Sequence, residues 1–230
     1  MCMPREISNT INYILDNIIP PIFRDQYWFM APFMRIVLGS KFKYYTEFKE
    51  KVPYLTNAEI DNYYTLLADT FIKRETDLNK LSVSFILGNL KGDSVIDIGC
   101  GRGYLTRQIL KLGRFKEIYG FDVSPPSVCD GIVYQSGSIL NLPYVDKQFD
   151  TVICAHTLEH IFDIDTAIKE LKRITRKRLI IVMPRQREYK YTFDLHIHFL
   201  PYLYSFKKLI NEPDAIFHEL NRDFICVVDY

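Results

Sequence analysis

Residues 95–103, VIDIGCGRG, join a buried-strand pattern to a glycine-rich turn. The apolar residues of this segment surround a single acid, Asp97, and three glycines follow at alternate positions. Glycine allows a sharp turn with positive φ and lets a ligand lie against bare peptide N–H groups. Apolar residues then recur at helical spacing over residues 105–112. A strand, a glycine turn and a helix N-terminus together predict a nucleotide-binding corner.

A second short apolar segment, IYGFD at residues 118–122, also ends in an acid. Asp122 lies 122 − 97 = 25 residues after Asp97. This is close to the offset of roughly 20 residues at which an acid after the second strand of a βαβ unit meets ribose hydroxyls. The two acids therefore predict a ribose-bearing ligand, and they leave NAD, FAD and S-adenosylmethionine open.

The glycine spacing distinguishes among these ligands. Dinucleotide-binding proteins carry G-x-G-x-x-G, whereas this chain has G-x-G-x-G with an acid two residues before the first glycine. The segments IYGFDVS, GSILNLPYVDKQFDTVICAHTLEHI and LKRITRKRLIIVMP follow in order. Together, over residues 90–184, these blocks resemble the class I S-adenosylmethionine-dependent methyltransferases of small-molecule type, with a methyltransferase-11-like domain. The resemblance implies an α/β fold with a doubly wound, Rossmann-like seven-stranded sheet whose last strand is antiparallel.

The resemblance also implies that S-adenosylmethionine is the cofactor. The glycine turn and the end of the second strand supply most of the binding positions, and the third loop and the end of the fourth strand supply the rest. The predicted cofactor-binding residues are Asp97, Gly99, Cys100, Gly101, Gly103, Asp122, Val123, Ser138, Ile139, Ala155 and His156. Ser138 stands where the family usually has an acid, so we expect a weaker hydrogen bond to the adenine amine there.

The first part of the chain reads as helical. Residues 1–90 lack a period-two pattern, and their apolar residues recur at helical spacing. A proline pair ends a first helix, and Thr56 with Glu59 matches the capping box that begins a second. We therefore predict an N-terminal helical cap over residues 1–90 and an S-adenosylmethionine-binding methyltransferase domain over residues 91–230.

The second half of the chain continues the alternation of strands and helices. The apolar segment at residues 149–155 predicts a buried strand, and a crossover helix over 163–175, with Asp165 as N-cap, follows it. Residues 215–220 and 224–230 then predict an antiparallel hairpin that closes the sheet.

Two motifs admit a competing interpretation. His156-Thr157-Leu158-Glu159-His160 matches the H-x-x-E-H zinc-protease signature, but it directly follows a buried strand, where the methyltransferase pattern itself carries L-E-H. We expect no metal. The basic cluster over residues 172–178 falls at a helix end and in a turn, where cations suit the helix dipole. With a net charge of +1 and no N/D-P-P-Y/F/W segment after the fourth strand, we expect no nucleic-acid partner.

The segment HIHF at residues 196–199 is a candidate for catalysis. It follows the fifth strand and resembles a histidine–phenylalanine segment found in many small-molecule members of the family. A histidine takes up a proton near neutral pH, so it suits an acceptor hydroxyl that must lose one. We predict His198 and His196 as catalytic residues, with His198 preferred. The alternative is that both rings form structural hydrogen bonds.

These observations predict methyl transfer from S-adenosylmethionine to a small-molecule acceptor, with a hydroxyl oxygen of a saccharide or related metabolite preferred. One alternative is C- or N-methylation of a quinone, a lipid-linked metabolite or an amine. Another is a non-catalytic S-adenosylmethionine-binding subunit that serves a partner. The oligomeric state is not predicted.

Cysteine usage and hydropathy bear on location. The five cysteines occur without C-x-x-C pairs and no signal peptide is recognisable, so we expect a cytoplasmic protein. The apolar run over residues 27–39 is interrupted and too short to span a bilayer. Membrane contact is not expected, although the apolar segments IIPPIF and WFMAPFM leave contact with a lipid surface open.

Overall fold

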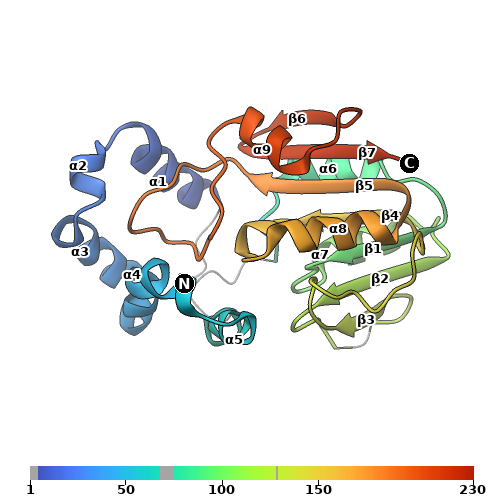
Figure 1. Ribbon diagram of the computed structural model, residues 1–230, viewed down its shortest axis with the longest axis horizontal. Coiled ribbons are helices and arrows are strands. Elements are labelled where there is room, and N and C mark those ends of the chain that lie inside the picture. Colours follow the sequence, from blue (N-terminus) through green and yellow to red (C-terminus); the bar gives the residue numbers. More distant parts are fainter. Residues whose placement is uncertain (1–4, 68–74, 128) are drawn as a thin grey trace. The chain divides into compact units, whose positions relative to one another are not determined.

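A computed structural model describes residues 5–67, 75–127 and 129–230. The chain divides into two units, which are coloured along the sequence in Figure 1. The helical unit comprises Met1–Arg74 and Gln186–Phe199, and the sheet unit comprises Glu75–Arg185 and Leu200–Tyr230. The predicted boundary lies at residue 90, whereas the units divide after residue 74, and the segment after the fifth strand belongs with the helices.

A seven-stranded sheet forms the centre of the sheet unit, in the order β3-β2-β1-β4-β5-β7-β6. Its strands are β1 (Ser94–Ile98), β2 (Glu117–Asp122), β3 (Val133–Ser136), β4 (Phe149–Ala155), β5 (Thr175–Pro184), β6 (Ile216–Leu220) and β7 (Asp223–Asp229). Strands β1 to β5 pair in parallel, whereas β7 runs antiparallel to both β5 and β6. This confirms the predicted fold class, and the strand order reverses between β1 and β4, where ligands bind in open sheets of this kind.

Helices cover both faces of this sheet (Figure 1). They are α6 (Lys80–Gly88) and α7 (Tyr104–Lys111) on one face, and α8 (Ile164–Ile174) and α9 (Leu203–Ile210) on the other. Strand β5 explains the two layers, because Leu179 and Ile181 pack towards α8 while Ile180 and Val182 pack towards α6 and α7. Both sides of a parallel sheet are buried, so its strands read as continuous apolar runs.

Three local features of the sheet unit differ from the expectation. Strand β3 was not anticipated, because its residues are half-exposed and lack a clear apolar run. Strand β5 begins directly after α8, so no loop separates them. The N-cap of α8 is Asp163 rather than Asp165, and its Oδ1 accepts a hydrogen bond from the Thr166 N–H at 3.2 Å. Asp165 lies in the first turn, where its charge suits the helix dipole.

The helical unit is built from short helices. They are α1 (Arg5–Asn17), α2 (Pro21–Arg24), α3 (Tyr27–Leu38), α4 (Phe42–Lys51) and α5 (Asn57–Leu67), with single 3-10 turns η1 (Gly39–Lys41) and η2 (Val52–Tyr54) between them. The capping box is confirmed, since the Thr56 N–H donates to Glu59 Oε2 at 2.8 Å and the Glu59 N–H donates to Thr56 Oγ1 at 3.3 Å. Among the described residues, no helix has the length and apolar character needed to cross a membrane.

The segment Gln186–Phe199 completes the core of the helical unit. Tyr189 and Tyr191 pack into an apolar cluster with α1 and α3, and Leu195 packs into a second cluster with α4 and α5. Tyr64 of α5 fixes this second contact, because its hydroxyl donates to the Leu195 carbonyl at 2.7 Å. The helices of this unit therefore depend on a segment that follows them by more than a hundred residues in the sequence.

Candidate functional site

The glycine turn after β1 is held against the end of β2. The backbone N–H groups of Gly99 and Cys100 both donate to the Phe121 carbonyl, at 2.7 and 3.1 Å. Gly99, Gly101 and Gly103 all have positive φ, at 76°, 50° and 71°. The sequence-based prediction of a sharp turn between a strand and a helix is thus met residue by residue, and Gly103 caps α7 in the left-handed region.

The three glycines serve different purposes. A Cβ at Gly99 would lie 2.0 Å from Thr157 Oγ1, and a Cβ at Gly103 would lie 2.3 Å from the Tyr134 hydroxyl. These two positions are therefore filled by the protein itself. Gly101 is exposed, and a Cβ there would have no neighbour within 4 Å. Of the turn, Gly101 is the position that leaves bare backbone open to a ligand.

Asp122 ends β2 and faces this open backbone. Its Oδ2 accepts a hydrogen bond from the Gly101 N–H at 2.8 Å, and its Oδ1 accepts one from the Ser124 N–H at 2.9 Å. A carboxylate oxygen accepts about two hydrogen bonds, so each oxygen keeps capacity for one further donor. The backbone thus fixes this carboxylate in a position where it suits a pair of adjacent hydroxyls, as in a ribose.

Asp97 lies in the middle of this arrangement but is sealed from water. It is 3% exposed within β1, opposite Gly120 of β2 and Ile153 of β4. Burial, with a smaller contribution from the nearby Asp122 charge, raises the pKa of Asp97 to about 8. At neutral pH the folded protein therefore holds the Asp97 carboxyl largely in its protonated form.

This raised pKa predicts a pH-dependent stability. Between its ordinary value of 3.8 and its folded value of about 8, the folded protein holds a proton on Asp97 that the unfolded chain has lost, so stability falls as the pH rises. From pH 6 to pH 8 this group should lower the free energy of unfolding by about 2 kcal/mol. Urea denaturation at both pH values should show that Asp97→Asn removes this difference. The exposed Asp93, whose pKa is lowered by Lys116, provides a control, and Asp93→Asn should keep the parental slope.

The remaining predicted cofactor residues border the same edge of the sheet. Ala155 ends β4 and is partly exposed, and Val123 directly after β2 is 45% exposed. Ile139 is buried, and the exposed Ser138 uses its Oγ to accept a hydrogen bond from the Leu140 N–H at 3.3 Å. Cys100 is buried, and burial raises the pKa of its thiol, so this thiol is unreactive. The binding roles of these residues stay predictions.

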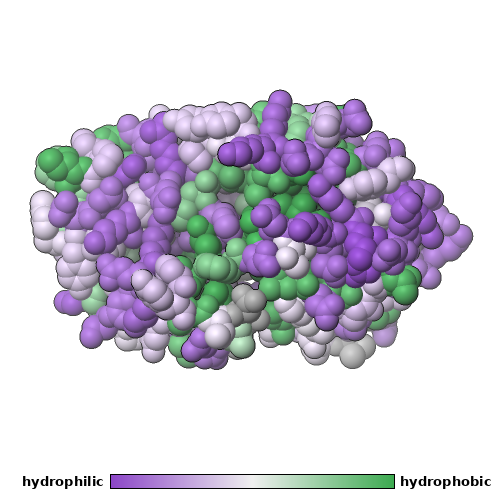
Figure 2. Space-filling view, viewed as in Figure 1, coloured by the Kyte–Doolittle hydropathy of each residue, from purple (hydrophilic) through white to green (hydrophobic). Residues whose placement is uncertain are grey.

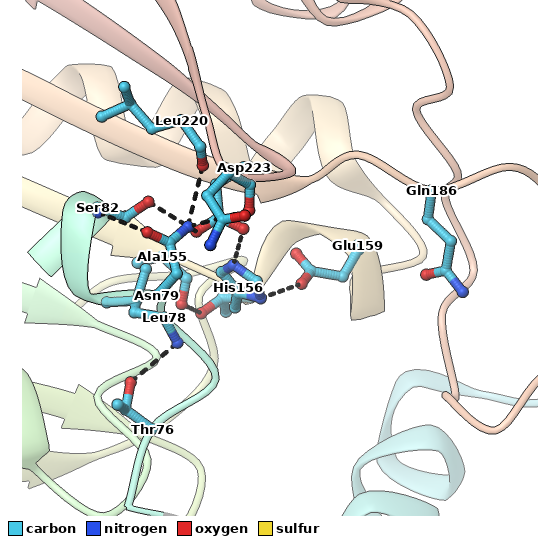
Figure 3. A network of polar contacts seen from close by, with 12 residues as sticks. Thr76, Leu78, Asn79, Ser82, Ala155, His156, Glu159, Gln186, Leu220 and Asp223 are labelled. Atoms are coloured by element: carbon cyan, nitrogen blue, oxygen red, sulfur yellow. Dashed lines mark hydrogen bonds and ion pairs between the residues drawn. The ribbon is translucent and has the colours of Figure 1, made fainter. Parts of the chain in front are cut away.

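His156 is held by a buried polar network (Figure 3). It follows β4 with a φ of 52°, and its Nε2 lies 3.1 Å from Oδ1 of Asp223, which is fully buried at the start of β7. Asp223 Oδ2 accepts two more hydrogen bonds at 2.7 Å, from Asn79 Nδ2 and from Ser82 Oγ. Asn79 also caps α6, because its Oδ1 accepts from the Ser82 N–H at 2.9 Å. The ring of His156 therefore ties the end of β4 to α6 and β7.

Glu159 lies on the other side of the His156 ring. It belongs to the 3-10 turn η3 (Leu158–His160), is fully buried, and has its Oε1 3.7 Å from His156 Nδ1 (Figure 3). Burial raises the pKa of Glu159 to about 7, against the lowering effect of His156. The H-x-x-E-H segment thus begins directly after β4 and ends in a single 3-10 turn, instead of forming the long helix that the zinc-protease signature requires.

Asn79, Ser82 and Asp223 are the residues of this site that the sequence did not reveal. Asn79 and Ser82 lie at the start of α6, and Asp223 begins the second strand of the C-terminal hairpin. Asn79 and Asp223 are 144 positions apart in the sequence. The pattern Asn-x-x-Ser before an apolar helix was a usable capping signal for the first two. Nothing in the local sequence around Asp223 distinguishes it from a solvent-exposed hairpin acid.

The predicted catalytic histidines lie in the helical unit, whereas all predicted cofactor residues lie in the sheet unit. His196 is 9% exposed, and its Nδ1 lies 2.7 Å from Gln186 Oε1. Gln186 Nε2 in turn donates to Asp194 Oδ2 at 3.2 Å. Because the amide oxygen of Gln186 is an acceptor, Nδ1 of His196 carries the proton and Nε2 is its basic nitrogen. His198 is half-buried in the same segment.

The basic cluster at the end of α8 is paired with acids of the same unit. Arg173 bonds Glu170 at 2.7 Å, and Arg178 bonds Asp229 at 2.7 Å. Asp150 Oδ1 accepts a hydrogen bond from Arg176 Nε at 2.8 Å, and Lys177 Nζ lies 2.9 Å from the same oxygen. These ion pairs support the interpretation of this cluster as part of the fold.

Comparison with known proteins agrees with this geometry. Residues 96–183 match the family model described as a methyltransferase domain. A tRNA U34 carboxymethyltransferase of Nautilia profundicola is 34% identical over 94 residues, which cover 36% of this chain and 31% of that protein. A ubiquinone biosynthesis O-methyltransferase of Pseudomonas fluorescens is 29% identical over 113 residues, 44% of this chain and 48% of that protein. The chain therefore matches about a third to a half of the length of these relatives.

A solved structure has the same fold over most of its length. The S-adenosylmethionine-dependent methyltransferase from Aquifex aeolicus matches with a TM-score of 0.52 at 15% identity, covering 76% of this chain and 98% of that one. At this identity the likeness establishes the fold alone. The match to the methyltransferase family model supports S-adenosylmethionine as the cofactor.

One expectation is contradicted by the relatives. We expected no nucleic-acid partner, but relatives from Nautilia profundicola, Campylobacter hominis and Campylobacter curvus, 31% to 34% identical, are tRNA U34 carboxymethyltransferases. The expectation was wrong because it rested on the net charge, which averages over the chain, and on the absence of a motif that concerns only amino groups. Neither feature describes the surface that meets an acceptor.

The glycine turn, the Asp122 carboxylate, the strand order and the family match all fall in the same part of the chain. Residues 96–183 therefore form a methyltransferase domain, set in a sheet with the strand order of a Rossmann-like methyltransferase fold.

Proposed function

We propose that the protein binds S-adenosylmethionine and transfers its methyl group to an acceptor. The observation that carries this proposal is the pairing of open backbone at Gly101 with the Asp122 carboxylate, inside a family-matched domain. The two remaining acceptor positions of Asp122 suit the ribose hydroxyls, and the exposed Gly101 allows close approach of the ligand. When bound, the cofactor supplies a methyl group already activated by its sulfonium.

The residues of this chain would then bind, orient and exchange protons. Asp122 would fix the ribose, and the turn at Gly101 would lie against the ligand without a side chain between them. The protonated Asp97 carboxyl lies next to Asp122, so a cationic ligand would favour its ionised form. Because the donor is activated, alignment of the acceptor with the methyl carbon is the main contribution required of the protein.

We propose His196 or His198 as the group that takes the proton of an acceptor hydroxyl. For His196 the support is the Gln186 contact, which sets Nε2 as the basic nitrogen. For His198 it is the resemblance of the HIHF segment to small-molecule members of the family. If either is the base, its replacement by Ala should lower methyl transfer by roughly 10²- to 10⁴-fold and leave cofactor affinity nearly unchanged.

The pH profile separates this role from a structural one. The parental rate should rise with pH, and this rise should be lost in the variant that lacks the base, because only the neutral imidazole accepts a proton. Phe199, whose ring centroid lies 6.0 Å from that of His196, is the control, since Phe199→Leu should change stability without changing this profile. Full turnover by both His→Ala variants would assign a structural role to the segment.

For the acceptor we propose a hydroxyl oxygen of a small metabolite. The O-methyltransferase named among the relatives supports oxygen as the acceptor atom, and a saccharide is our first choice because tyrosine, histidine, aspartate and arginine occur in the segment after β5. The alternatives are C- or N-methylation of a quinone, a lipid-linked metabolite or an amine, and a non-catalytic cofactor-binding subunit. A transfer RNA is a second candidate, which the tRNA-directed relatives support.

A transfer assay with radiolabelled S-adenosylmethionine tests the proposal. The protein should be incubated with pooled sugars, quinols, amines and transfer RNA in parallel, after titration calorimetry with S-adenosylhomocysteine and with NAD. Micromolar binding of S-adenosylhomocysteine and none of NAD is expected, with label in one acceptor pool. Tight NAD binding would overturn the cofactor assignment, and cofactor binding without transfer to any pool would favour the binding subunit.

We also propose a cytoplasmic location. Cys100, Cys154 and Cys226 are buried, free thiols of the sheet unit. Reducing compartments keep such thiols unpaired, which supports this location.

A further inference from the structure

Helix α3 is apolar on both of its faces. Its buried side chains are Met30, Ala31, Met34 and Leu38. Its outward side chains include Trp28, Phe33 and Ile36, which are 65%, 53% and 83% exposed. A helix of a soluble domain normally carries polar residues on the side opposite its core, so the outward face of α3 requires a separate explanation.

Aromatic contacts join this face to α2 into one surface. The ring of Phe29 has its centroid 6.2 Å from that of Phe23, 5.9 Å from that of Trp28 and 5.6 Å from that of Phe33. Ile22, beside Phe23 in α2, is 70% exposed. We call Ile22, Phe23, Trp28, Phe29, Phe33 and Ile36 the apolar face of the helical unit. Figure 2 shows hydrophobic residues reaching the surface at the end of this unit that carries α2.

Basic residues outnumber acids in the sequence around the apolar face. Arg35 is exposed and adjoins Ile36 in α3. Asp25 is the one acid in the sequence between residues 17 and 46, and its Oδ1 accepts a hydrogen bond from the Lys190 N–H at 2.9 Å. Lys190 Nζ lies 3.7 Å from Glu50 Oε1 and 5.5 Å from the centroid of the Tyr191 ring. The Tyr191 ring meets Tyr27 edge-on, with the two centroids 5.9 Å apart. Lysine and arginine at the rim of an apolar surface suit the anionic headgroups of a bilayer.

We propose that the apolar face of the helical unit binds the surface of an anionic lipid bilayer, with α3 lying in the plane of the interface. The 12 residues of α3 would extend about 18 Å at 1.5 Å per residue, which is too short for a hydrocarbon core of about 30 Å. Tryptophan and tyrosine prefer the boundary between headgroups and acyl chains, and protruding Ile22 and Ile36 side chains enter the apolar layer. This inference does not depend on the proposed methyl transfer.

The chain offers a direct probe, because Trp28 is its single tryptophan. Full-length protein should be mixed with vesicles of phosphatidylcholine alone and with vesicles that also contain phosphatidylglycerol. We expect co-sedimentation and a blue shift of Trp28 emission with the anionic vesicles, weaker with the neutral ones and reduced by salt. Ile36→Glu should lower the partition coefficient by at least about tenfold, because it replaces a large apolar side chain by a charge.

Tyr54→Glu provides the matched control. Tyr54 belongs to the same unit, is 87% exposed and lies outside the apolar face, so this variant should bind vesicles like the parent. Equal loss of binding in Tyr54→Glu and Ile36→Glu would overturn the proposal, as would unchanged Trp28 emission with vesicles. A blue shift that follows protein concentration without lipid would identify a second copy of the chain as the occupant and would also overturn it. Unchanged circular dichroism of both variants would confirm that they are folded.

Discussion

Asp122→Ala should weaken S-adenosylhomocysteine binding by roughly 10²- to 10⁴-fold. In the proposed site the Asp122 carboxylate accepts hydrogen bonds from two ribose hydroxyls, and each charge-assisted bond contributes about 1.5 to 3 kcal/mol. The substitution also removes the acceptor for the Gly101 and Ser124 N–H groups, which hold the turn in its open shape. Titration calorimetry of the parent and the variant under the same conditions measures the ratio of dissociation constants.

Two further variants make this test specific. Asp122→Asn keeps one acceptor oxygen and loses the charge, so its affinity should fall between those of the parent and Asp122→Ala. Asp93→Ala removes an exposed carboxylate just before β1, at the opposite end of that strand, and should bind like the parent. A folded Asp122→Ala protein with parental affinity would remove Asp122 from the cofactor site.

The strand, the glycine turn and the helix start that follow residue 94 were predictable because their determinants are local. The strand, the three positive-φ glycines and the acid at the end of β2 follow one another within about thirty residues, and each is fixed by backbone conformation or by burial pattern. The Thr56 capping box is equally local. In such segments a local backbone conformation, such as a positive φ or a helix start, selects a particular residue type, and that residue type can be read from the sequence.

The division of the chain was less predictable because it depends on contacts between distant segments. Leu78 and Ile86 pack on the sheet, so the helix before β1 belongs to the sheet unit although its own pattern resembles the helices before it. Conversely, Tyr189 and Leu195 pack with helices that precede them by more than a hundred residues. Helical periodicity reports that a face is buried, and it does not identify the partner that buries it.

The same reasoning applies to individual glycines. Sequence alone assigned Gly99, Gly101 and Gly103 a shared role in approaching the ligand. The positive φ values agree with the turn, but Thr157 and Tyr134 occupy the space beside Gly99 and Gly103. Which side chain lies beside a glycine depends on the tertiary structure. The turn could therefore be predicted from the sequence, but not which of its glycines is open to a ligand.

The largest loss of stability is expected for Asp223→Ala. Its carboxylate is fully buried and bonds Asn79, Ser82 and His156, at 2.7, 2.7 and 3.1 Å. Removing it leaves the buried Asn79 and Ser82 and the partly buried His156 without this acceptor, and breaking such a network costs about 3 to 5 kcal/mol. Urea denaturation at constant pH measures the change in the free energy of unfolding.

Asp229→Ala is the matched control, because it removes the same side chain from the other end of β7. Asp229 is 43% exposed on its side chain and pairs with Arg178 and Lys91, so water can replace much of what these pairs contribute and its loss should cost less than that of Asp223. A double-mutant cycle between Asp223→Ala and Asn79→Ala should give a coupling energy of about 1 kcal/mol or more, since these groups share one network. If Asp223→Ala lowered the free energy of unfolding by no more than Asp229→Ala does, water would be replacing the Asp223 carboxylate. The network would then not be what holds His156 at the end of β4.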